Sequence, residues 1–147
     1  MTILRITSTG DKTVYSVVTT DGDTTLGGQD LDTALVEHFV YALEKEHGEE
    51  VRLNKKIMKG LREACEKVKI NLSISEHTSI DFFGGTLNGK PVVLEEQVKR
   101  EDFERICSPI FDSTMDCVTR ACVRALKEED IDSCEFGFVN VSRPYFN

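Results

Sequence analysis

Four residues of one segment have the types and the spacing of a surface that contacts a nucleoside. Glu66, Lys69, Ile70 and Ser73 are spaced i, i+3, i+4 and i+7, so in a helix they share one face. The carboxylate can accept hydrogen bonds from sugar hydroxyls, the ammonium and the hydroxyl can donate them, and isoleucine offers a flat apolar support. An ordinary solvated face with a weak Glu66–Lys69 pair has the same pattern, and spacing alone favours that plainer interpretation.

A glycine pair comes directly before another predicted helix. Gly27 and Gly28 directly follow the run Gly22-Asp23-Thr24-Thr25-Leu26. Glycines at a helix start can expose backbone N–H groups and let a ligand approach closely. A tight turn is the more common reason for such a pair. The segment is not a P-loop, because the Gly-Lys-Ser/Thr ending is absent.

The cysteines and histidines give no sign of a metal site or a disulfide framework. The five cysteines are an odd number without a Cys-x-x-Cys pair, and the three histidines are scattered. Zinc sites need such ligands at short, paired spacing. We therefore expect reduced and mostly buried thiols, and no metal, at Cys65, Cys107, Cys117, Cys122 and Cys134.

Charge and composition exclude several classes of partner. The 147 residues carry 18 basic and 26 acidic side chains, a net charge of −8, which disfavours binding to nucleic acid and to anionic membrane surfaces. No apolar run approaches the ~20 residues that span a bilayer, and the first residues do not resemble a signal peptide. We expect a cytoplasmic protein with one domain, or two closely packed subdomains.

Hydrophobic periodicity predicts the elements that must position these residues. Two β-branched runs predict a hairpin of Thr2–Thr7 and Thr13–Thr20. A helix should run from Gln29 or Asp30 to about Glu46 and end at His47-Gly48. Asn54 should cap a second helix that reaches about Ser73. The apolar stripes predict the buried faces Leu31, Leu35, Val36, Phe39, Val40 and Leu43 in the first helix, and Ile57, Leu61, Cys65, Val68 and Leu72 in the second.

The remainder of the chain predicts a second hairpin and a further helical region. Strands are expected at Thr78–Phe83 and Pro91–Glu95, with Gly84-Gly85 and Asn88-Gly89 as turn signals. A helix opening at residues 99–102 should break or kink near Pro109, after which a long helix follows. Residues 130–132 suggest a turn, and 136–141 a final strand. The order indicates an α+β, or mixed α/β, fold without repeats or a clear domain boundary.

Three motifs in sequence order resemble one known family. The run Gly22–Asp32 matches the pattern Gly-Asp-Thr-x-Leu-Gly-Gly-x-Asp-Phe-Asp of the seventy-kilodalton heat-shock (DnaK-type) chaperones, and only Leu31 departs from it. The segment Arg62–Ser73 resembles the adenosine-contacting helix of their ATPase domain. Arg100–Cys107 is similar to the family's Arg-x-x-Phe-Glu-x-Leu-Cys helix. The resemblance covers nearly the whole chain.

This resemblance implies part of an actin-like ATPase fold. Residues 1–147 should be a partial nucleotide-binding domain, namely most of the second lobe with its outer helix-helix-hairpin subdomain. In the family, the positions of Glu66, Lys69 and Ser73 contact adenosine, Gly28 lies nearby, and the residue at Ile70 can lie against the base. The implied ligands are ATP and ADP, with Mg²⁺ only in a complete parent domain. The implied partners are a nucleotide exchange factor or co-chaperone, and the remaining lobe.

Several parts of the family's catalytic machinery have no match in this sequence. The first-lobe phosphate loop and its catalytic lysine are absent, and the second phosphate loop would lie just before Met1. The glycines of Gly-Gly-Ser-Thr-Arg-Ile-Pro are replaced within Val139–Tyr145. Because phosphoryl transfer needs positioned phosphates, Mg²⁺ and an oriented water, we expect no catalytic residue and no ATP turnover in this chain alone.

Three interpretations remain open at this level. The leading one is a fragment of the chaperone ATPase domain that carries part of the adenosine site and a surface for exchange factors. The second is an ATPase whose other parts come from a longer parent. The third is a regulatory or interaction protein that kept the fold and lost nucleotide binding.

Overall fold

The computed structural model describes residues 1–24 and 26–129, and it divides into two compact units. Among the described residues, one unit comprises residues 1–22 together with 116–129, and the other comprises the residues between 23 and 115. The second boundary falls inside a helix, where neither composition nor turn residues mark it. This explains why the sequence showed no clear boundary. The turn predicted at 130–132 and the strand at 136–141 lie outside the described residues.

The first unit contains the predicted N-terminal hairpin. Strands β1 (Thr2–Thr9) and β2 (Lys12–Thr20) pair antiparallel, with Leu4 opposite Val17 and Ile6 opposite Tyr15. The unit also contains the later turns of α4 (Arg100–Glu129). There Cys117, Ala121 and Ala125 recur every fourth residue and are buried, which is the pattern of one packed helix face.

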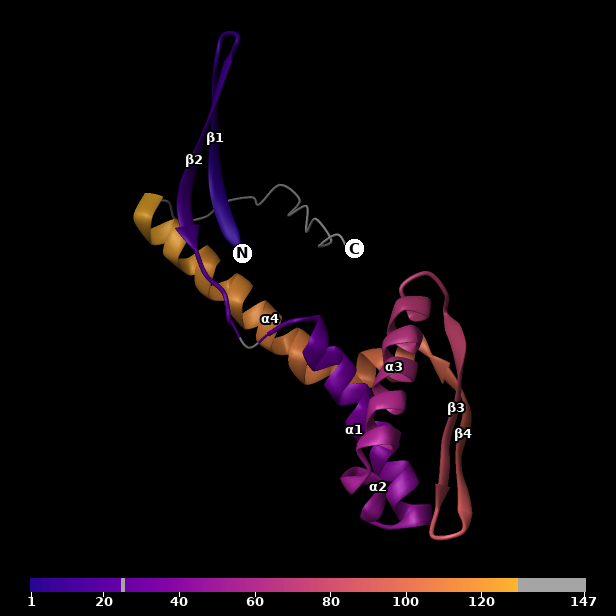
Figure 1. The fold of residues 1–147 in the computed structure, drawn as a ribbon. Helices are drawn as coiled ribbons and strands as arrows, with labels where there is room; N and C mark the ends of the chain where they lie inside the picture. Colours follow the sequence, from indigo (N-terminus) through magenta and orange to yellow (C-terminus); the bar gives the residue numbers. More distant parts are fainter. Residues whose placement is uncertain (25, 130–147) are drawn as a thin grey trace. The chain divides into compact units, whose positions relative to one another are not determined.

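The second unit is built around two long helices and the other hairpin. Helices α1 (Gly28–His47), α2 (Glu50–Leu53) and α3 (Lys55–Leu72) are followed by strands β3 (His77–Leu87) and β4 (Lys90–Lys99). Helix α3 packs against both α1 and β3 (Figure 1). The mixed α/β class and the helix-helix-hairpin order are confirmed. The sequence prediction missed α2, whose Glu50 accepts a hydrogen bond from Asn88 in the β3–β4 turn.

Local sequence signals explain where these helices begin. The Asn54 side chain accepts hydrogen bonds from the backbone N–H groups of Lys56 and Ile57, at 3.1 and 3.2 Å, as an N-cap does. At the start of α1, the Asp30 carboxylate accepts from the Gly27 N–H at 2.6 Å. A negative side chain in the first turn is also favoured by the helix dipole. The predicted cap at Asn54 is confirmed.

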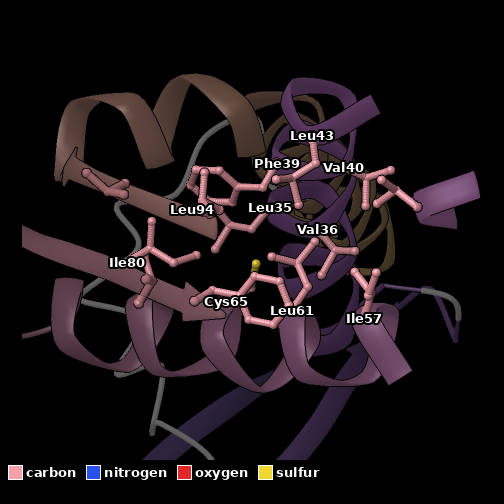
Figure 2. Packing of buried hydrophobic residues seen from close by; sticks show 14 of the residues in the cluster. Leu35, Val36, Phe39, Val40, Leu43, Ile57, Leu61, Cys65, Ile80 and Leu94 are labelled. Carbon is pink, nitrogen blue, oxygen red and sulfur yellow. The ribbon is translucent and has the colours of Figure 1, made fainter. Parts of the chain in front are cut away.

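Helix α1, helix α3 and the second hairpin enclose one hydrophobic core (Figure 2). Every stripe residue predicted for the two helices is fully buried except Leu31, which is half-buried. The Phe82 ring fits between two glycines. A Cβ atom on Gly60 would lie 2.9 Å from its Cε2, and one on Gly84 would lie 3.1 Å from its Cε1. Small residues at both positions therefore let the hairpin approach α3 closely.

Strands β3 and β4 are longer than predicted. Gly84-Gly85 is not a turn but a bulge inside β3, where the register shifts and Gly85 adopts a φ of +93°. The turn is made by Asn88 and Gly89, with φ values of +51° and +78°, as Asn-Gly hairpins require. A bulge keeps the strand paired while admitting one extra residue, so pairing extends from His77–Lys99 to Leu87–Lys90.

Of the break or kink predicted near Pro109, the break is wrong, because α4 is continuous from Arg100 to Glu129. Proline removes the hydrogen bond that residue 109 would give to the Arg105 carbonyl. Both residues are exposed, so water can satisfy that carbonyl and the helix persists.

Among the described residues, no helix is long and apolar enough to cross a membrane.

Candidate functional site

Lys69 joins the two helices that carry the predicted site residues. Its Nζ lies 3.1 Å from the Gly28 carbonyl oxygen and 2.7 Å from Oδ2 of Asp32. The Lys69 and Asp32 side chains are 14% and 21% exposed, so solvent screens this ion pair less than a surface pair. The structure thus brings Gly28 and Lys69 into direct contact. It adds Asp32, which the sequence analysis did not single out.

Asp32 is held in an unusual environment for a carboxylate. Its Oδ1 is buried and has no hydrogen-bond partner within the described residues.

The same region contains two buried thiols. Burial, followed by the negative charge of Asp32, raises the pKa of Cys65 to about 12 and that of Cys107 to about 11. Both thiols therefore stay protonated near neutral pH, and neither is poised as a nucleophile.

Glu66 lines a cavity next to this contact. The cavity has a volume of about 390 Å³ and is lined by Gln29, Asp32, Thr33, Arg62 and Glu66. That volume is within the usual range of small-molecule sites. Gly28, at the start of α1, and Glu66 and Lys69, in the second half of α3, therefore lie near one another although 41 positions separate Gly28 from Lys69.

Ile70 and Ser73 continue the predicted face of α3. Ile70 is 53% exposed, so it offers apolar surface to a ligand. The Ser73 hydroxyl donates to the Ile70 carbonyl at 2.7 Å. This bond uses the donor of the hydroxyl, but its oxygen can still accept. Among the five predicted residues, Ser73 is the one whose side-chain hydrogen-bond donor is already used within its own helix.

A second cavity lies along the first half of α3. Its volume is about 510 Å³, and it shares Arg62 and Glu66 with the first cavity. Sequence reasoning did not identify it, although the cations at 55, 59 and 62 have helical spacing. The complete lining is Arg52, Lys55, Met58, Lys59, Arg62, Glu63 and Glu66.

The hydrogen-bonding side chains that line the first cavity determine which ligand groups it can contact. Glu66 and Asp32, which line it, can accept hydrogen bonds from hydroxyl or amino groups, and Arg62 can donate them. The described residues contain no group of three metal-ligating side chains that could hold Mg²⁺.

Comparison with known proteins identifies the family. A family model described as Hsp70 protein matches residues 2–137. The chain belongs to the Hsp70 family. It is 36% identical over 119 residues to heat shock 70 kDa protein 2 of Paracoccidioides lutzii, and 36% identical over 126 residues to heat shock 70 kDa protein BIP3 of Oryza sativa subsp. japonica. Chaperone protein DnaK of Mycoplasma mobile is 36% identical over 119 residues.

These matches cover most of this chain and a small part of each relative. The aligned segments span 81%, 83% and 80% of the chain, but 17%, 18% and 20% of the three relatives. The chain therefore corresponds to about a fifth of an Hsp70 protein. Its mixed α/β structure, with two small antiparallel sheets, is consistent with a piece of the actin-like ATPase domain of this Hsp70 family.

Proposed function

We propose that this Hsp70 chain supplies part of the adenosine-binding side of a chaperone ATPase domain, together with a surface for an exchange factor or co-chaperone. The observation that carries the proposal is the contact of Lys69 with Gly28 and Asp32. It joins α1 and α3 beside the cavity lined by Glu66. This contact supports a common site for Gly28, Glu66 and Lys69, three of the residues that the family resemblance assigned to adenosine.

Each side chain has a distinct role in this proposal. Glu66 accepts hydrogen bonds from the ribose hydroxyls, and Lys69 is positioned by Asp32 at the edge of the sugar site. Ile70 lies against the base. The Ser73 oxygen accepts from the exocyclic amine of adenine, since its own proton is used within the helix.

ATP hydrolysis by a complete parent domain needs groups beyond these residues. The phosphates and Mg²⁺ are held by the remaining lobe and the phosphate loops of the parent in this proposal. Mg²⁺, when bound there, neutralises charge on the phosphates. The residues of this chain bind and orient the nucleoside, which positions the phosphates for that chemistry.

The isolated chain should bind adenosine and ADP weakly and with similar affinity. Two or three hydrogen bonds contribute ~1 kcal/mol each, against an association cost of at least ~4 kcal/mol. We expect a dissociation constant in the millimolar range or weaker, about −4 kcal/mol. In ¹⁵N-resolved NMR titrations, both ligands should shift the Gly28, Glu66, Lys69, Ile70 and Ser73 amides.

A matched pair of variants tests the assignment. Glu66→Ala should abolish these shifts, whereas Glu63→Ala, on the same helix but outside the first cavity, should leave them unchanged. Shifts confined to other parts of the chain would contradict the proposed site. Micromolar affinity that is lost in Glu66→Ala would show that this half-site is sufficient by itself.

One observation favours the alternative of a regulatory or interaction protein without nucleotide. Lys69 is engaged by Asp32 and Gly28, and the Ser73 proton by its own helix, so two predicted ligands already have partners. In that case, 10 mM adenosine (on the order of the weakest affinity considered) should shift none of the five amides while a protein partner still binds.

A further inference from the structure

The tip of the β3–β4 hairpin carries an asparagine that a glycine follows. Asn88 is the one asparagine of the chain with this neighbour. In such a pair the backbone nitrogen of the glycine can attack the side-chain amide carbon of the asparagine, because glycine has no side chain that would hinder the approach. Both Asn88 and Gly89 are exposed, so water, the other reactant of amide hydrolysis, can reach them.

The backbone N–H of Gly89 is not engaged in the hairpin. Strand pairing ends at Leu87 and Lys90, and the two residues between them have φ values of +51° and +78°, so they form a two-residue turn outside the ladder. Within the described residues, the Gly89 N–H donates to no acceptor. The attacking nitrogen is therefore available, and only its approach to the Asn88 amide carbon is restricted.

The other asparagines among the described residues, Asn54 and Asn71, lack this arrangement. The side-chain oxygen of Asn54 accepts hydrogen bonds from two backbone N–H groups of α3, which hold it in place as the helix cap. The nitrogen after Asn71 belongs to Leu72, inside α3, where a helical N–H bonds to the carbonyl four residues earlier. Asn88 alone among the three thus has an unbonded glycine nitrogen beside its amide.

One contact restrains the Asn88 side chain. Its Nδ2 donates a hydrogen bond to Oε2 of Glu50, the first residue of α2. Helix α2 is itself anchored, because Val51 is fully buried and Arg52 pairs with two carboxylates of α1. A hydrogen bond to a carboxylate is stronger than one between neutral groups. Glu50 therefore has to release the amide before the amide carbon can reach the Gly89 nitrogen.

We propose that Asn88 is a site of spontaneous deamidation and that Glu50 sets its rate. The Gly89 nitrogen loses its proton and forms a bond to the Asn88 amide carbon. The bond from that carbon to the side-chain nitrogen breaks, and ammonia leaves. Water then opens the five-membered imide ring at either carbonyl, which produces aspartate or isoaspartate at position 88. One water is consumed and one ammonia released, without any oxidation or reduction.

The product changes the hairpin tip in two ways. A carboxylate at position 88 cannot donate to Glu50, and two negative charges then lie side by side and repel each other. Isoaspartate also adds a methylene group to the backbone, which disturbs the geometry of a two-residue turn. The modification therefore separates the tip from α2. Neither cavity is lined by Asn88 or Gly89, so this inference does not rest on the proposed adenosine site.

Peptide mass spectrometry of the full chain tests the site. Samples taken over days at pH 8 are digested, and chromatography separates the asparagine, aspartate and isoaspartate forms of each peptide. Deamidation should appear at Asn88 before it appears at Asn54 or Asn71. Glu50→Ala should accelerate it roughly fivefold, the factor by which losing one typical hydrogen bond favours release of the side chain.

Glu49→Ala is the matched control, because it removes the same charge next to α2 from a side chain that makes no capping hydrogen bond. It should leave the rate at Asn88 unchanged. In urea the original chain and Glu50→Ala should deamidate equally fast, since the contact with α2 exists only in the folded chain.

Two further variants separate the chemistry from its consequence. Asn88→Gln keeps an amide donor but would need a six-membered ring, so it should show no modification at position 88. Asn88→Asp, which imitates one product, should make the amides of residues 86–90 exchange faster with solvent hydrogen. Deamidation at Asn88 no faster than at Asn54 and Asn71, or equal rates in folded Glu50→Ala and the folded original chain, would overturn the proposal.

Discussion

At the scale of single residues, Asp21 is the buried charge of the N-terminal unit. Its side chain is 5% exposed and lies 3.1 Å from both Arg120 and Arg124. The hydrogen bond from Arg120, then the positive charges of both arginines, lowers the pKa of Asp21 below its ordinary value of 3.8, although burial opposes the shift. A lowered pKa in the folded state means that the ionised carboxylate stabilises the fold.

This contribution should be lost in acid. It is fully present above pH 3.8 and disappears as the pH falls through the lower folded-state pKa. Asp21→Asn should therefore reduce the melting temperature at pH 7, and its melting temperature should fall less than that of the original chain between pH 5 and pH 2. Asp116→Asn, at an exposed position, is the control. An equal acid dependence in Asp21→Asn would contradict the assignment.

The thiols give a second prediction at this scale. Cys65 and Cys107 are 0% exposed, and their raised pKa values of about 12 and 11 leave little thiolate at pH 8. Cys122 is half-buried. Alkylation by iodoacetamide at pH 8, followed by peptide mass spectrometry, should modify Cys122 well before Cys65 or Cys107. Denaturant should remove the difference in alkylation rate between these cysteines. Rapid alkylation of Cys65 in the native chain would contradict the prediction.

At the scale of elements, the start of α3 depends on one side chain. Asn54 satisfies two backbone N–H groups that have no partner inside the helix. Asn54→Ala should lower the free energy of unfolding by about 1 kcal/mol, measured by urea denaturation. Asn71→Ala, which removes only an exposed contact with Thr78, should cost less. If the two variants cost the same, the cap is not what stabilises this helix start.

Element types were easier to predict than element lengths. The periods of α1 and α3 and the Asn88-Gly89 turn are local features, so the sequence indicated them correctly. Gly84-Gly85 and Pro109 are also local signals, but each permits more than one structure. Pairing across the hairpin made the glycines a bulge, and exposure of Pro109 allowed α4 to continue.

At the scale of the whole molecule, the two units differ in how much apolar surface they bury. The core cluster lies within residues 35–98. In β1 and β2, by contrast, Leu4, Ile6, Tyr15 and Val17 are 49%, 62%, 65% and 65% exposed. A two-stranded hairpin without a buried face is only marginally stable, so local stability should differ between the units.

Hydrogen exchange can measure this difference in the intact chain. Amides of α1, α3, β3 and β4 should exchange through rare opening of the core, whereas those of β1 and β2 should exchange much faster. Mass spectrometry at peptide resolution, with exchange times from seconds to hours, separates the two classes. Equal protection of β1 and β3 would show that the first hairpin is covered by more than the described residues.

The sequence by itself predicted the family motifs, the helical faces and the residue types of the proposed adenosine site. These depend on spacing within one segment, which backbone geometry converts directly into a shared face. Only the tertiary structure decided that Asp32 holds Lys69 against Gly28, that Phe82 lies between Gly60 and Gly84, and that a second cavity lies along α3. Such contacts join positions far apart in the chain, and packing of whole elements selects them from many pairings that local rules allow equally.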